Sequence, residues 1–162
     1  MKSTRKIAVI TGVIFIIATV ASLLAAALTP VLTGMDYLPR FSAHTNQVAA
    51  GALLYIITAF TSAGIAIAMY PVTNERNAGL ALGSVVFRAL EAVFYLVGVM
   101  CLLSLRTLGQ QLTTAGAPDR ASLQAIGDSL VSVHDQAALV AVVAVVLLLV
   151  GATHDELGGS HW

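Results

Sequence analysis

The sequence predicts an all-α integral membrane protein, a multi-span helical bundle with about four transmembrane helices. Of its 162 residues, 58% are hydrophobic and only 10% are charged, whereas soluble domains carry about 25% charged residues. Four apolar stretches are each long enough to supply the roughly 20 helical residues that cross a hydrocarbon core. We therefore expect a single transmembrane domain at 1–152, with spans near 7–28, 48–70, 78–105 and 123–152, and a polar tail at 153–162.

The first span follows a short basic segment. Lys2, Arg5 and Lys6 precede the apolar run at 7–28, and an excess of positive charge marks the cytoplasmic side of a membrane protein. A cleavable signal peptide is the alternative, since the alanines at 25–27 resemble a cleavage site. Signal peptides have shorter apolar regions of about 7–15 residues, so we favour an uncleaved span with a cytoplasmic N-terminus.

The segment 29–47 is expected to be a loop, because Pro30, Gly34 and Pro39 interrupt helices. Its apolar and aromatic residues are expected in the headgroup layer as an interfacial belt; they are Tyr37, Leu38 and Phe41. Asn46 stands at the start of the next span. We favour capping and interfacial solvation for Asn46, and the alternative is a polar mouth leading to a site between helices.

The second span, at 48–70, carries a stripe of polar and small residues at helical spacing. Its members are Gly51, Tyr55, Thr58 and Ser62. Such a stripe lets helices approach closely and hydrogen-bond within a membrane. We expect it to lie beside the charged residues of the third span, with Tyr55 as a candidate site residue and Pro71 as the end of the helix.

The third span, at 78–105, contains Arg88 and Glu91 near its middle. Each charge costs about 3 kcal/mol at a helix centre, and the surrounding apolar residues return about as much in total. Residues three apart share a helix face, so the two side chains can pair. Two interpretations are about equally favoured: an ion pair that only fixes helix packing, and a site for an ion, a proton or a polar ligand.

The last span begins with a polar half that carries Asp128, His134 and Asp135. If the last two spans pack antiparallel, we expect either aspartate to reach Arg88, and His134 to reach Glu91. A carboxylate–imidazole contact in a low dielectric suits proton relay or general-base work. The alternative, modestly favoured, is a charge network that neutralises itself.

Other chemistry has little support in the sequence. No zinc-protease, nucleophile-elbow or phosphate-loop motif is present, so an enzyme is disfavoured and no metal or cofactor is expected. The single Cys101 allows no intramolecular disulfide. The formal net charge is zero, without a long basic run, so we expect no nucleic-acid partner. The expected partners are the lipid bilayer and either a second copy or another membrane protein.

Three stretches resemble a known family. They are STRKIAVITGVIFIIATVASLL, NQVAAGALLYIITAFTSAGIAIAMYPV and NAGLALGSVVFRALEAVFYLVGVMCLLSL, with AGAPD and HDQAALV further on. The chain resembles the bacterial membrane-protein family called domain of unknown function 4386 (DUF4386) from about Met1 to about Gly151.

The resemblance implies a multi-span helical bundle in the bacterial cytoplasmic membrane, and it implies no reaction. It draws attention, without a role, to five positions: Asn46, Gln47, Arg88, Glu91 and Asp135. Family members continue with further spans, whereas this chain turns polar after Gly151. We therefore expect a natural short form, a frameshifted tail or a fragment.

Three function classes remain open from the sequence. The first is a membrane protein whose buried polar site binds or passes a small polar solute or a proton. The second is a structural or regulatory membrane partner whose charges set helix packing. The third, least favoured, is an intramembrane enzyme acting on a lipid-type substrate, with Glu91 or His134 as base.

Overall fold

The computed structural model describes residues 2–32, 34, 36–114 and 116–158, and these residues form five helices and no strand. The helices are α1 (Lys2–Leu28), α2 (Tyr37–Ala43), α3 (Thr45–Asn74), α4 (Ala78–Leu112) and α5 (Ala117–Gly158). Within the described part of the chain, four helices are long and apolar enough to cross a membrane, namely all except α2. The predicted fold class is confirmed, and the chain is a multi-pass membrane protein.

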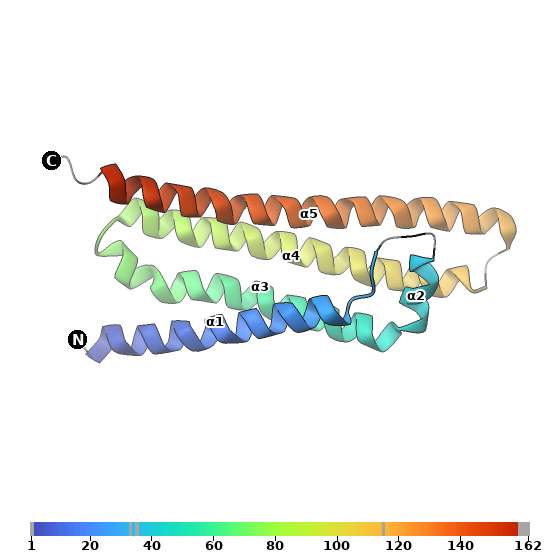
Figure 1. Ribbon diagram of the computed structural model, residues 1–162, viewed down its shortest axis with the longest axis horizontal. Coiled ribbons are helices and arrows are strands. Elements are labelled where there is room, and N and C mark those ends of the chain that lie inside the picture. The colour runs from blue at the N-terminus through green and yellow to red at the C-terminus, as the bar shows by residue number, and fades with distance from the viewer. Residues whose placement is uncertain (1, 33, 35, 115, 159–162) are drawn as a thin grey trace.

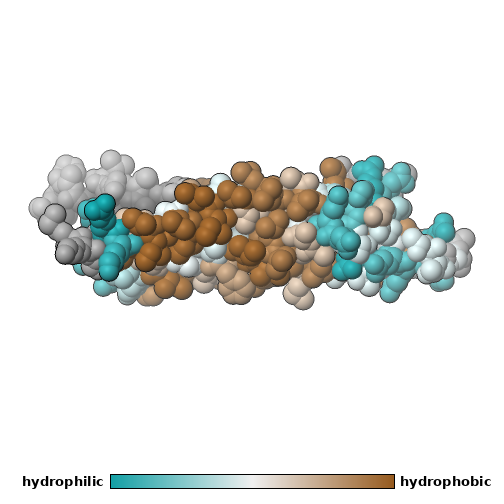
Figure 2. All heavy atoms as spheres, turned by 90° about the horizontal axis from the view of Figure 1, so that it is seen from below, coloured by the Kyte–Doolittle hydropathy of each residue, from teal (hydrophilic) through white to brown (hydrophobic). Residues whose placement is uncertain are grey.

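The four long helices form an open row and not a closed bundle. α3 packs against α1 on one side and α4 on the other, and α4 packs against α3 and α5. Figure 1 shows this order, α1, α3, α4 and α5, across the molecule. The face in Figure 2 carries a broad apolar band between two polar ends, as expected for a protein that sits in a bilayer.

The helices extend beyond the spans that the sequence indicates. α4 continues seven residues past Leu105, and α5 begins six residues before Leu123. At about 1.5 Å per residue, the 42 residues of α5 reach about 63 Å, twice the thickness of a hydrocarbon core. The prediction that Pro71 ends its helix was wrong, because α3 continues to Asn74. A proline removes a single ladder hydrogen bond, which the last turn of α3 tolerates. α5 also includes part of the predicted tail, and residues 159–162 lie outside the described part.

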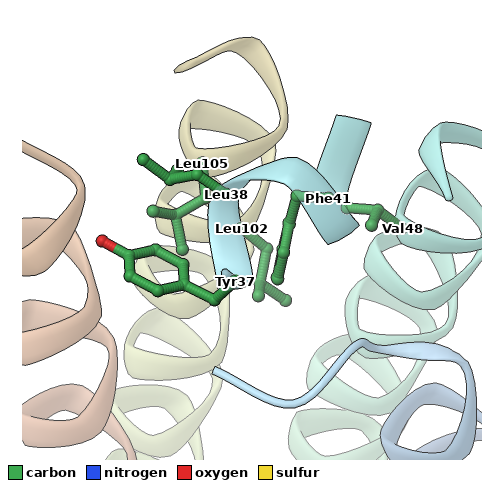
Figure 3. Packing of buried hydrophobic residues seen from close by; sticks show 6 residues of the cluster. All are labelled: Tyr37, Leu38, Phe41, Val48, Leu102 and Leu105. Carbon is green, nitrogen blue, oxygen red and sulfur yellow. The ribbon is translucent and has the colours of Figure 1, made fainter. Parts of the chain in front are cut away.

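The short helix α2 fills the space at one end of the row, within the segment 29–47 that the sequence predicted to be a loop; that prediction was wrong for Tyr37–Ala43. Tyr37, Leu38 and Phe41 are almost fully buried, so these side chains pack inside the protein, whereas residues of an interfacial belt would face the lipid head groups. They pack with Val48, Leu102 and Leu105. Figure 3 shows α2 in front of α4, with α3 on one side and α5 on the other. We call α2 and this cluster of six residues the α2 cap.

Two glycines allow α2 to approach α4 and α5 closely. A Cβ atom at Gly109 would collide with the Leu38 carbonyl oxygen, and one at Gly127 would lie 2.6 Å from the Tyr37 hydroxyl. That hydroxyl donates a hydrogen bond of 2.7 Å to Asp128 Oδ1 on α5. Burial raises the pKa of the Tyr37 phenol, and the hydrogen bond and charge of Asp128 raise it further. The phenol therefore remains a protonated donor that ties α2 to α5.

We expect Gly109→Ala to destabilise the protein by about 1–3 kcal/mol, the usual cost of inserting a group into packed structure. Gly83→Ala on the same helix is the matched control, because a Cβ atom at Gly83 meets nothing within 4 Å. The control should be neutral or stabilising by up to about 1 kcal/mol, through its higher helix propensity. Thermal unfolding in detergent measures both variants. Equal stability of the two would contradict the close packing of the α2 cap.

Candidate functional site

The charged residues of α4 lie well inside its apolar part. Asn77 directly precedes α4, and its side chain caps the helix by accepting a hydrogen bond of 3.0 Å from the Leu80 amide. Arg88 and Glu91 follow Ala78 by ten and thirteen residues, which places them about 15 and 20 Å along the helix. Arg88 Nη1 lies 2.8 Å from Glu91 Oε2, at the i, i+3 spacing.

Ser62 on α3 completes a three-residue polar network with this pair. Its hydroxyl donates to Glu91 Oε2 at 2.9 Å and accepts from Arg88 Nη1 at 3.1 Å. Glu91 and Ser62 are buried, while 29% of the Arg88 side chain is exposed. The network neutralises the carboxylate and joins α3 to α4, in agreement with the predicted position of the α3 stripe beside the charges. We call it the Arg88–Glu91–Ser62 network.

A cavity of about 410 Å³ lies beside the network, between α3, α4 and α5. Its polar lining residues are Tyr55 from α3, Glu91 and Tyr95 from α4, and His134 from α5. Alanine, valine, phenylalanine and glycine form the remainder of the wall. The rings of Tyr55 and Tyr95 are stacked, with centroids 6.4 Å apart and an interplanar angle of 23°. Such aromatic pairs stabilise by about 0.5–1.5 kcal/mol beyond their burial.

His134 lies at a different level of the cavity from Glu91. Its Nδ1 atom is 3.4 Å from the Gly98 carbonyl oxygen, and a Cβ atom at Gly98 would lie only 3.3 Å from that nitrogen. Gly98 follows Glu91 by seven residues, or about 10 Å along the helix. His134 and Glu91 therefore do not contact each other as expected. Both line the same cavity, and each has its own hydrogen-bond partners.

The aspartates of α5 lie away from Arg88, contrary to the expected contact. α4 and α5 run antiparallel with Gly98 beside His134, so Arg88, ten residues before Gly98, is level with Ala144, ten residues after His134. Asp135 and Asp128 precede Ala144 by nine and sixteen residues, or about 14 and 24 Å.

Each aspartate has a different environment. Asp135 is exposed. Asp128 accepts hydrogen bonds from Tyr37 at 2.7 Å and from Gln124 at 3.2 Å, as part of the contact between α2 and α5. The α4–α5 register places both carboxylates towards the α2 end of the molecule.

Asn46 also lies apart from the cavity. It is exposed at the start of α3, where it lines a small surface pocket together with His44 and Gln47. Nine residues separate it from Tyr55, or about 14 Å along the helix. Among the described residues, no group of three His, Cys, Asp or Glu side chains is placed to hold a metal ion.

The profile of one protein family matches residues 10–153, and that family is described as domain of unknown function (DUF4386). The match covers most of the chain, so the chain belongs to this family, as the resemblance in its sequence indicated. No curated protein and no solved structure matches the chain. The family description carries no activity, and the function is therefore argued from the cavity.

A double-mutant cycle measures what the ion pair contributes. Removing one partner of a buried pair costs about 3–5 kcal/mol, whereas replacing both with apolar residues is often neutral or stabilising. We expect Arg88→Met to cost about 3 kcal/mol, the lower end, because part of its side chain is exposed. Arg88→Met combined with Glu91→Leu should cost less than either single change in thermal unfolding. Arg76→Met, at an exposed turn, is the control; additive costs would contradict the pairing.

Proposed function

We propose that this protein binds a small molecule in the cavity between α3, α4 and α5. One observation carries the proposal: Tyr55, Glu91 and His134, from three different helices, line a single cavity of about 410 Å³. That volume lies within the range of about 300–1,000 Å³ that is usual for small-molecule sites. Ionisable residues inside a membrane segment mark binding or transport sites more often than other positions do.

The orientation that we propose places the N-terminus in the cytoplasm of a bacterium, with the protein in its cytoplasmic membrane. The start of α1 and the turn between α3 and α4 lie at the same end of the row (Figure 1). That end carries Lys2, Arg5, Lys6 and Arg76, against Arg40, Arg106 and Arg120 at the α2 end. The first helix usually dominates topology through its flanking positive charges. The α2 end is then external.

The geometry favours binding over passage of a solute. The α2 cap fills the external end of the space between α3 and α5, and Tyr55 both lines the cavity and packs against this cap. An aqueous route from outside would have to displace Leu38 and Phe41, which are fully buried. The cavity therefore fits a site that retains a molecule better than a continuous polar path.

A structural or regulatory role is the second candidate, and the open row of helices favours it. Among the described residues, α1 makes its extensive helix contacts with α3, and side chains such as Phe15 and Leu23 are 59% and 66% exposed. A second copy of the chain or another membrane protein can pack on these faces. On this proposal the Arg88–Glu91–Ser62 network serves only to hold α3 and α4 together.

Thermal unfolding in lipid nanodiscs, in the presence of chosen probes, separates the two candidates. The probes are arginine, spermidine, hexadecanol, palmitate and geranylgeraniol. A ligand at 100 times its Kd stabilises by about 2.7 kcal/mol, which corresponds to about 5–10 °C for a chain of this size. We expect at least one probe to raise the melting temperature of the wild type by this amount.

The control variants locate the effect. Ala141→Phe places a large side chain in the cavity wall, whereas Leu139→Phe adds a ring on the exposed side of the same helix. The first change should abolish the shift and the second should leave it. The binding proposal fails if no probe shifts the wild type by more than about 1 °C, or if the shift survives Ala141→Phe.

A further inference from the structure

The walls, ends and openings of the cavity point to one class of ligand, and this inference rests on the proposed binding function. We propose that the ligand is a single-chain amphiphile, an aliphatic chain with one oxygen head group, that enters sideways from the bilayer. The head lies beside His134, and the chain runs along α5 towards Val146.

The cavity is long, narrow and mostly apolar. Its α5 wall runs from His134 to Val146, twelve residues or about 18 Å. Three alanines on α5, at 137, 138 and 141, have small side chains that leave space in the cavity. Phe94 and Val99 line the opposite side from α4. A polar solute lying along this alanine and valine wall would lose its water and find few replacement hydrogen bonds there, which is unfavourable. An aliphatic chain incurs no such cost.

The external end of the cavity is closed to water. Leu130 and Val131 lie within one turn of His134 on α5, and both pack against the α2 cap. Tyr55 closes the same end from α3. The Tyr37–Asp128 hydrogen bond of 2.7 Å holds α2 against α5 just beyond these residues. A ligand from the external solution therefore meets packed side chains.

The side of the cavity is open towards lipid. Val142 and Val146 line the cavity, yet they are 60% and 50% exposed. Ala138, one turn before Val142, is also a lining residue with an exposed side chain. In a bilayer, exposed residues of this apolar segment face hydrocarbon chains. A molecule already dissolved in the bilayer can enter between α3 and α5, which are not packed together as α4 and α5 are, without crossing water.

His134 lies at the depth where the head of an amphiphile belongs. Gly98, its neighbour on α4, follows Ala78 by twenty residues, or about 30 Å, the full thickness of a hydrocarbon core. A neutral imidazole has one nitrogen that donates a hydrogen bond and one that accepts, and a protonated imidazole donates from both. Either a hydroxyl or a carboxylate can therefore hydrogen-bond to this side chain. Glu91 lies deeper; Arg88 already balances its charge and Ser62 hydrogen-bonds to it, so the ligand needs no positive charge.

Photo-crosslinking in vesicles tests this assignment. The full chain is reconstituted in phosphatidylcholine vesicles with diazirine-bearing hexadecanol or, separately, diazirine-bearing palmitate, and labelled peptides are mapped by mass spectrometry. We expect label at Phe94, Ala138 and Val142, reduced at least tenfold by an excess of the unlabelled amphiphile. The more efficient of the two probes identifies the head group.

Variants distinguish the cavity from general contact with lipid. Ala141→Phe should reduce labelling about tenfold, Leu139→Phe should not change it, and His134→Ala should reduce competition by the unlabelled amphiphile about fivefold. If Ala141→Phe fails to fold, Ala138→Phe at the exposed rim takes its place. Label spread evenly over α1 and α5, or equal competition by a two-chain phospholipid, would overturn the inference.

The two proposals fail in different ways. If arginine or spermidine gives a thermal shift that Ala141→Phe abolishes, while amphiphile labelling is not competed, the cavity binds a polar solute and only this inference is wrong. If neither a thermal shift nor competed labelling occurs, the cavity is not a binding site and both proposals are wrong.

Discussion

Hydrocarbon cannot solvate a charge, and the rest of this structure depends on how α4 meets that constraint. Arg88 and Glu91 satisfy each other at 2.8 Å, and Ser62 from α3 hydrogen-bonds to both. The network fixes the rotation of α4 against α3, because any other rotation would turn a charge towards lipid. Because Arg88 balances the charge of the Glu91 carboxylate, an apolar cavity can lie directly beside it. The same interaction therefore sets the helix packing and the character of the site.

Because the helices form an open row, the cavity is uncovered along one side and closed by packed side chains at the α2 end. A closed bundle would enclose the space on all sides, whereas among the described residues α5 makes its extensive helix contacts with α4, and one side of the cavity is uncovered. At the α2 end, the α2 cap is tightly packed, and it depends on Gly109 and Gly127 for its close approach to α4 and α5. Our proposal that the cavity is reached from the membrane and closed to water rests on these two features, which support an amphiphile over a polar solute.

Local spacing in the sequence predicted the contacts of Arg88 with its neighbours. Four apolar stretches define the spans, and helical periodicity places Arg88 beside Glu91 and the α3 stripe beside both. The α4–α5 register is a tertiary property, set by the contact of Gly98 with His134, and no local pattern specifies it; the expected contact of Asp135 with Arg88 was wrong for this reason. The seven residues of α2 are too few to show a periodic signal, and Pro39 indicated a loop.

A spin label at the rim of the cavity tests the central claim, that the cavity opens to lipid and is closed to water. The label is attached to Ala138→Cys in a Cys101→Ser background, and power saturation compares collisions with oxygen, which dissolves in lipid, and with a water-soluble nickel chelate. Gln110→Cys, at the exposed end of α4, is the reference. We expect high oxygen and low nickel accessibility at Ala138→Cys. Nickel accessibility equal to that of Gln110→Cys would contradict the account.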